Sequence, residues 1–135
     1  MISEMENWEE SHWKNPIADT GTPINRRRTG TAYEQRAKEH LEKQGYHILE
    51  KNYRCAFGEI DLIGTEEDTL CFIEVKYRSG VRYGTASEAV TPSKQKTIRR
   101  VASWYLLQKN KQYQKIRFDV AAIDRSTITL FRNAF

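Results

Sequence analysis

Three charged residues interrupt two otherwise apolar segments of the chain. Asp61 lies in Ile-Asp-Leu-Ile at 60–63, and Glu74 and Lys76 lie in Leu-Cys-Phe-Ile-Glu-Val-Lys-Tyr at 70–77. Because side chains alternate along a β-strand, Glu74 and Lys76 are expected on one face, with their bases roughly 6–7 Å apart. Charges within apolar strands are costly unless they meet a partner. A hairpin with both acidic faces on one side would bring Asp61 to Glu74 and Lys76.

This combination of residue types suits metal-assisted phosphate chemistry. Two neighbouring carboxylates repel each other, and a divalent cation such as Mg²⁺, which prefers oxygen ligands, relieves that repulsion. A cation so placed can polarise a phosphate and activate water, while a lysine stabilises the charge that develops on phosphorus. A lone Glu-x-Lys on a strand is usually a surface ion pair. The additional Asp61 and the apolar setting of Glu74 favour the catalytic interpretation.

Helical and strand patterns place this cluster in an α/β domain. They predict helices at 31–44 and 92–109 and strands at 46–54, 59–63, 69–77, 116–123 and 127–131. Gly45 is expected to end the first helix, and Thr91 and Pro92 to begin the second. Short turns at 56–58 and 66–68 make the first three strands a meander. The expected architecture is a central mixed β-sheet flanked by helices, in the order αβββαβ.

For the strand expected at 59–63, the pattern also predicts the face on which each side chain lies. Strict alternation puts Glu59, Asp61 and Ile63 on one face of the strand. It puts Ile60 and Leu62 on the other. The carboxylate of Asp61 is therefore expected on the side away from this apolar pair.

Charge divides the chain into two parts. Residues 1–29 are expected to form a polar tail and residues 30–135 the domain. Residues 1–25 carry one basic and five acidic residues, whereas 26–135 carry 21 basic and 13 acidic residues, a net −4 against +8. A basic domain favours polyanions such as nucleic acid. The basic side chains expected to contact it are Arg54, Arg78, Arg82, Lys94, Lys96, Arg99 and Arg100. Trp8 and Trp13 are expected to dock the tail on the domain or on a partner.

The remaining composition bounds the compartment and the chemistry. No run approaches the ~18 consecutive apolar residues of a membrane span, and no secretory signal is visible. Two cysteines are too few for a disulfide scaffold, so a reduced, cytoplasmic setting is expected. Cys71 is expected in the core, and the three histidines show no metal-ligand spacing. Asp119 is expected to have a structural role, paired with Arg117 or capping a loop.

The two motifs around the charged cluster resemble those of the bacterial YraN family. The resemblance rests on Gly-Glu-Ile-Asp-Leu-Ile at 58–63 and on Phe-Ile-Glu-Val-Lys-Tyr-Arg at 72–78, and it extends over roughly residues 30–125. That family is similar to archaeal Holliday-junction resolvases and belongs to the PD-(D/E)xK restriction-endonuclease-like group. Tyr33 departs from the pattern, since a small residue is expected before Glu34.

The resemblance implies a restriction-endonuclease-like core and roles for individual residues. Asp61 and Glu74 would be ligands of Mg²⁺ or Mn²⁺, with the Val75 carbonyl as a third. Lys76 would be the catalytic lysine, and Glu34, on the first helix, would help to bind the metal. The likeness to resolvases also makes a homodimer reasonable, because two sites are needed to cut two strands.

Two functions of different classes follow from these observations. The first is a Mg²⁺-dependent endonuclease that hydrolyses DNA phosphodiesters, with branched or structured DNA as the implied substrate. The second is a nucleic-acid-binding accessory protein in DNA processing or uptake, without turnover. No organic cofactor is expected for either, and neither involves a membrane partner.

Overall fold

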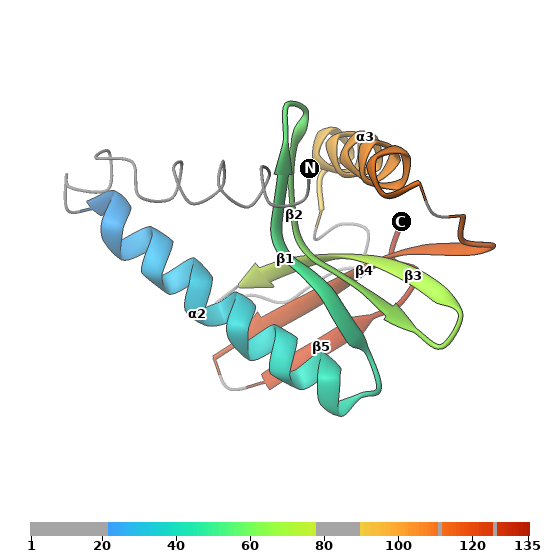
Figure 1. Cartoon of the computed structure of the whole chain (residues 1–135). Coiled ribbons are helices and arrows are strands. Elements are labelled where there is room, and N and C mark those ends of the chain that lie inside the picture. The colour runs from blue at the N-terminus through green and yellow to red at the C-terminus, as the bar shows by residue number, and fades with distance from the viewer. Residues whose placement is uncertain (1–21, 78–89, 111, 126) are drawn as a thin grey trace.

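The computed structural model describes residues 22–77, 90–110, 112–125 and 127–135, with only the backbone for 22–31. The elements, labelled as in Figure 1, are α2 (Thr22–Lys43), β1 (His47–Cys55), β2 (Gly58–Glu66), β3 (Thr69–Tyr77), α3 (Pro92–Lys109), β4 (Lys115–Asp124) and β5 (Thr127–Phe131). Arg78, Arg82, Trp8 and Trp13, for which the sequence predicts roles, lie outside the described residues.

The five strands form one mixed sheet in the order β1-β2-β3-β4-β5. β3 and β4 are parallel, and every other neighbouring pair is antiparallel. The parallel pair needs a crossover connection, and α3 lies in the chain between these two strands. The predicted α/β architecture and its meander of three strands are therefore confirmed, and β5 adds an antiparallel edge. The arrangement is consistent with a restriction-endonuclease-like core.

Helix α2 is longer than the sequence pattern predicted. It begins at Thr22 rather than at residue 31, so it runs across the expected boundary between tail and domain. Pro23 fits a first helical turn, and the arginines that follow favour a helix without contributing to an apolar stripe. Periodicity therefore missed this part. Gly45 follows the end of α2 and has φ +103°. Its predicted role in ending this helix is confirmed.

Helix α3 has the predicted bounds and the predicted beginning. The Thr91 side chain caps it by accepting a hydrogen bond from the Lys94 amide at 3.2 Å, and Pro92 occupies the first turn. Its buried face consists of Ile98, Val101, Ala102 and Tyr105. Asn110 ends the helix in a left-handed conformation.

The two helices cover different core clusters. Ile60 and Ile63 belong to the cluster that includes the buried face of α3, whereas Leu62 packs with the buried residues of α2. The predicted strict alternation in β2, with Ile60 and Leu62 on one face, is therefore wrong. The irregularity coincides with Asn52 on β1, whose φ is +57°, between the pairs Lys51↔Leu62 and Tyr53↔Ile60. The register of the two strands also shifts between Ile48 and Glu50, and an irregularity of this kind bends and twists a strand pair.

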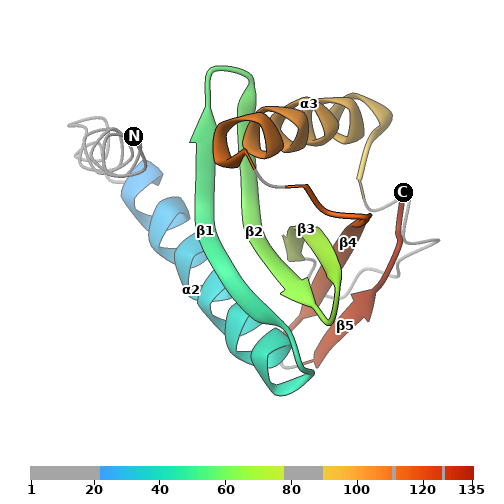
Figure 2. The same cartoon turned by 45° about the vertical axis from the view of Figure 1, so that its right-hand side comes forward.

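The bend directs the β1–β2 hairpin along two helices. Figure 2 shows one half of this ribbon beside α2 and the other half extending next to α3. Gly58 makes the second contact close: a Cβ atom at this position would lie 2.6 Å from Thr97 Cγ2. Because Gly58 has no side chain, the hairpin can approach α3 this closely.

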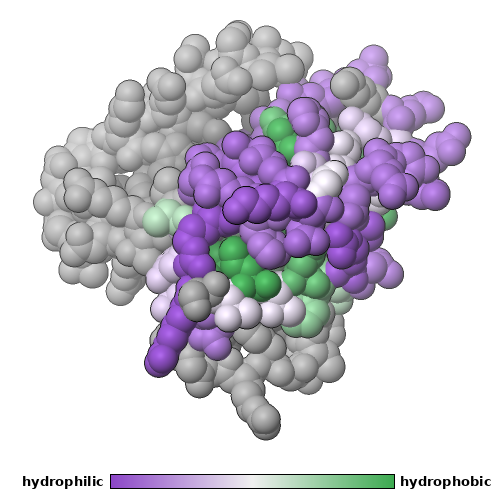
Figure 3. All heavy atoms as spheres, turned by 90° about the horizontal axis from the view of Figure 1, so that it is seen from below, coloured by the Kyte–Doolittle hydropathy of each residue, from purple (hydrophilic) through white to green (hydrophobic). Residues whose placement is uncertain are grey.

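The described surface carries no long apolar element. Among the helices that the structure describes, none is long and apolar enough to cross a membrane. Figure 3 views the molecule from below, where the described residues are largely hydrophilic and the apolar ones form small patches. Small patches of this kind are ordinary on a protein surface.

Candidate metal centre

The predicted carboxylates meet where β2 and β3 stop pairing. The antiparallel register ends at Leu62↔Ile73, so Asp61 and Glu74 are the next residues on the two strands. Asp61 Oδ2 accepts a hydrogen bond from the Val75 amide at 2.8 Å. This bond fixes the Asp61 carboxylate at the edge of β3. The structure therefore brings Asp61 to Glu74 as predicted, through the divergence of the two strands.

Glu74 and Lys76 lie on one face, as strand alternation predicted. Lys76 Nζ is 3.8 Å from Glu74 Oε2, and the Glu74 side chain is only 6% exposed. Burial, followed by the charge of the neighbouring Asp61 carboxylate, raises the pKa of Glu74 to about 8. The charges of Lys94, at the start of α3, and of Lys76 act in the opposite direction.

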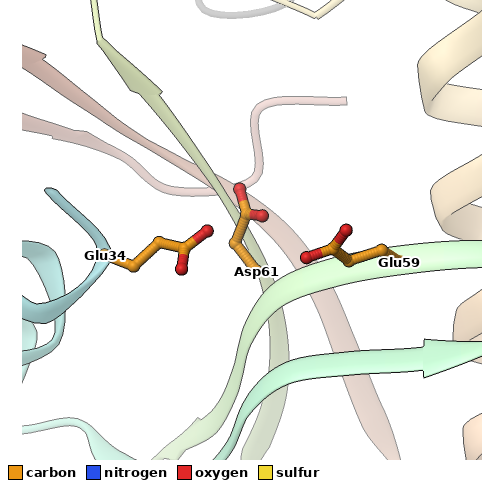
Figure 4. A group of neighbouring side chains, drawn as sticks. All are labelled: Glu34, Glu59 and Asp61. Carbon is orange, nitrogen blue, oxygen red and sulfur yellow. The ribbon is translucent and has the colours of Figure 1, made fainter. Parts of the chain in front are cut away.

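Helix α2 adds Glu34 to this cluster. Ligand oxygens of Glu34, Glu59 and Asp61 all lie within 4.8 Å of one another, and Figure 4 shows the three carboxylates turned toward a common centre. Burial is the main cause that raises the pKa of Glu34 to about 8, followed by the charges of Asp61 and Glu59. A hydrogen bond with the Asn52 side chain lowers it. Three chain segments thus contribute to one acidic centre.

Two members of the centre were missed from the sequence. Glu59 lies two residues before Asp61, and this spacing was the signal that could have identified it. Glu59 also forms an ion pair with Arg54, with 3.2 Å between Arg54 Nη2 and Glu59 Oε1. Asn52 is the second missed residue, and it is buried with a left-handed backbone. Asn tolerates this conformation, but the surrounding sequence carries no other signal that would have predicted it.

The donor set fits a hard divalent cation. It consists of oxygens, and Oε1 of Glu34 is buried without a hydrogen-bond partner in the described part of the chain. Buried carboxylates that repel each other are costly unless a positive charge is supplied. Mg²⁺ and Mn²⁺ suit oxygen ligands of this kind. In the described ranges, no group containing His or Cys gathers in the same way.

The basic residues predicted to contact nucleic acid lie in three settings. Arg54 is paired with Glu59, and Lys94 faces Glu74. The side chains of Lys96, Arg99 and Arg100 are exposed on α3. Arg78 and Arg82 lie beyond the described residues, so their assignment stays a prediction.

Other polar residues have the structural roles expected from the sequence. Asp119 is fully buried and accepts hydrogen bonds from Tyr46, Arg117 and the Asn133 amide. Cys71 is also fully buried, as predicted for a core residue. Neither lies in the acidic centre.

Fold and site together define a class: an α/β, restriction-endonuclease-like domain with a carboxylate and lysine cluster where two central strands diverge. A model of the Uncharacterised protein family UPF0102 matches residues 33–123, and the chain belongs to this family. It is the YraN family that the motifs resembled.

Relatives from several bacteria cover most of the chain. A UPF0102 protein of Caldicellulosiruptor saccharolyticus is 38% identical over 118 residues, which is 83% of this chain and 100% of the relative. One from Syntrophus aciditrophicus is 45% identical over 112 residues, 80% of this chain and 88% of the relative. UPF0102 protein STH1475 of Symbiobacterium thermophilum is 45% identical over 114 residues, 81% of this chain and 97% of the relative.

Proposed function

We propose that this protein is a metal-dependent nuclease that hydrolyses phosphodiester bonds of DNA. The observation that carries the proposal is the convergence of Glu34, Glu59 and Asp61 where β2 and β3 diverge. Glu74 lies next to Asp61, and Lys76 lies beside Glu74. Charged groups gathered in this way in a half-buried setting are typical of catalytic sites rather than of surface ion pairs. Family resemblance adds branched or structured DNA as the substrate class.

The residues divide the chemical work. Glu34, Glu59, Asp61 and Glu74 would hold Mg²⁺ or Mn²⁺, which when bound supplies Lewis acidity and lowers the pKa of water. The Val75 carbonyl remains a candidate ligand. Lys76, held near Glu74, would orient the attacking water and stabilise negative charge on the phosphate. The exposed cations of α3 would neutralise the phosphates that flank the cleaved bond.

Setting and assembly belong to the same proposal. Cys55 and Cys71 are free thiols, which fits a reduced cytoplasm. Cutting both strands of a branched DNA takes two centres, so we infer a homodimer as the acting form.

A cleavage assay with matched variants tests the nuclease. The full chain is incubated with labelled flaps, four-way junctions, single strands and linear duplexes, in Mg²⁺, in Mn²⁺ and in EDTA. We expect cleavage of structured DNA only with a divalent cation, and its loss by at least about a hundredfold in Glu74→Gln and Lys76→Ala. Glu67→Gln, which changes an exposed turn residue, is the control and should cleave normally. Cleavage that persists in both site variants would exclude this assignment.

The competing function is a nucleic-acid-binding protein without turnover. Its support is the net +8 of residues 26–135 together with the exposed Lys96, Arg99 and Arg100. Binding would then weaken steeply with salt and would survive Glu74→Gln. Steep salt dependence without cleavage on any substrate, with either metal, would favour this function over the nuclease.

A further inference from the structure

The tip of the β1–β2 hairpin presents an aromatic ring away from the core of the molecule. Cys55 pairs with Gly58, so Ala56 and Phe57 form a two-residue turn. Phe57 is 42% exposed although it is a large apolar residue. Figures 1 and 2 both show this end of the hairpin projecting beyond the sheet, beside α3.

Helix α3 holds this ring in a fixed position. The Arg100 guanidinium carbon lies 4.4 Å from the centre of the Phe57 ring. The Trp104 ring meets Phe57 edge to face, with 5.9 Å between the ring centres and an interplanar angle of 73°. Close approach of Gly58 to Thr97 fixes the hairpin itself. The ring is therefore oriented before any partner arrives, which lowers the entropy cost of binding.

An exposed ring flanked by a guanidinium matches the chemistry of an unpaired nucleotide. Bases stack on aromatic side chains irrespective of sequence, and arginine adds a stacking plane and a charge for phosphate. Lys96 and Arg99 extend positive charge along the exposed face of α3. Base pairs inside a continuous duplex are already stacked on each other, so they offer no free face to Phe57. The surface is thus suited to a single strand.

The hairpin connects this surface directly to the acidic centre. Phe57 lies in the turn immediately before β2, two residues before Glu59 and four before Asp61. At about 3.3 Å per residue, the Cα atom of Phe57 lies roughly 13 Å from that of Asp61. Stacked nucleotides advance about 3.4 Å along a strand, so this span corresponds to about four of them, and to fewer in an extended strand.

We propose that Phe57, backed by Arg100, is a stacking site for an unpaired base and sets the distance from that base to the cleaved phosphate. The proposal deepens the nuclease assignment and rests on it for the cleavage position. The binding of an unpaired base at Phe57 can be measured without cleavage of the DNA. The substrate class it selects is DNA in which a single strand leaves a duplex.

Binding is measured first, in EDTA, by fluorescence anisotropy of a labelled oligothymidylate and of a labelled blunt duplex. We expect Phe57→Ala and Phe57→Leu to weaken oligothymidylate binding about tenfold and duplex binding less than about twofold. Phe57→Trp, which keeps an aromatic face, should restore the affinity. Ile116→Ala is the matched control, because Ile116 is also 42% exposed and apolar but lies on β4.

The outcomes separate a stacking role from a structural one. Thermal unfolding of each variant shows whether it is folded; if Phe57→Ala is not, Phe57→Leu decides, since it keeps apolar packing on Trp104 and removes only the aromatic face. Equal losses for single strand and duplex, an effect no larger than that of Ile116→Ala, or failure of Phe57→Trp to restore binding would overturn the proposal.

Cleavage mapping on a splayed duplex distinguishes this inference from the nuclease proposal. Phe57→Ala should blur or shift the cut position by a few nucleotides, whereas Lys76→Ala should abolish cutting. If the protein cuts DNA but substitution of Phe57 changes neither the cut position nor the single-strand affinity, the stacking site alone is refuted. A protein that never cuts, yet binds single strands through Phe57, would refute the nuclease and leave the stacking site standing.

Discussion

Glu59 and Glu74 occupy different positions in the acidic centre. Glu74 is buried and is accompanied by Lys76, whereas Glu59 is half-buried and divides its interactions between the carboxylates and Arg54. A carboxylate shared in this way can turn toward a cation without leaving a buried charge unpaired. Glu59 is therefore suited to adjust metal affinity, while Glu74 and Lys76 are suited to act on the phosphate.

Substituting Glu59 tests this division. Glu59→Gln removes one negative charge from the centre, so Mn²⁺ affinity should fall about tenfold, because ligand charge sets the affinity of oxygen sites. Titration calorimetry or the paramagnetic signal of free Mn²⁺ measures the change. Glu67→Gln serves as the control, since its side chain is exposed on the β2–β3 turn. Equal Mn²⁺ affinity in Glu59→Gln and wild type would remove Glu59 from the ligand set.

At the scale of elements, the contact between the β1–β2 hairpin and α3 positions both the centre and the hairpin tip. Gly58 has φ +150° and lies against Thr97 and Val101. A side chain here would be strained by the backbone and crowded by α3. The contact therefore depends on glycine for two separate reasons.

Gly58→Ala should destabilise the protein by about 1–3 kcal/mol, through overpacking and backbone strain. Urea denaturation followed by circular dichroism measures the loss. Thr97→Ala in the same chain removes the atom that the new Cβ would meet, so the double variant should recover part of the stability. Full additivity of the two changes would mean that Gly58 and Thr97 do not interact.

The whole molecule is tied together at the opposite end of the sheet by charged hydrogen bonds. Glu66, at the end of β2, accepts from Arg132 at 2.7 and 2.9 Å and from Arg117 at 2.6 Å. Arg117 also bonds to the buried Asp119, which Tyr46 and the Asn133 amide contact. These bonds join Tyr46, directly before β1, to β2, β4 and the segment after β5, so they stabilise the frame on which the centre depends.

This network predicts sensitivity to acid. Hydrogen bonds from Arg132, followed by those from Arg117, lower the pKa of Glu66 to about 2. Since the folded pKa lies below the unfolded one, the stabilisation is present above pH ~4.5 and is lost as pH falls toward 2. Glu66→Gln should cost about 2 kcal/mol at neutral pH and flatten stability across this acid range. Urea midpoints across the range measure it; parallel curves for variant and wild type would contradict the assignment.

The features that the sequence predicted correctly are those that depend on interactions between residues close together in the chain. Helix α3, with Thr91, Pro92 and its apolar face, has the predicted bounds because its signals are all local. The pairing of Glu74 with Lys76 follows from strand alternation alone. The start of α2 at Thr22 was not predicted, because arginines continue a helix without marking a buried face.

The sequence by itself determined the mixed α/β order, the charged motifs and the family. Only the tertiary structure decided that Glu34 meets Asp61 and Glu59, with Glu74 beside Asp61. Regular alternation cannot show that β2 changes core clusters between Ile60 and Leu62, nor that Asn52 lies opposite this change with positive φ. Alternation is a property of one strand, whereas the bend and the approach of Glu34 arise from packing between segments far apart in the chain. That long-range packing brings Glu34 to Asp61 and Glu59.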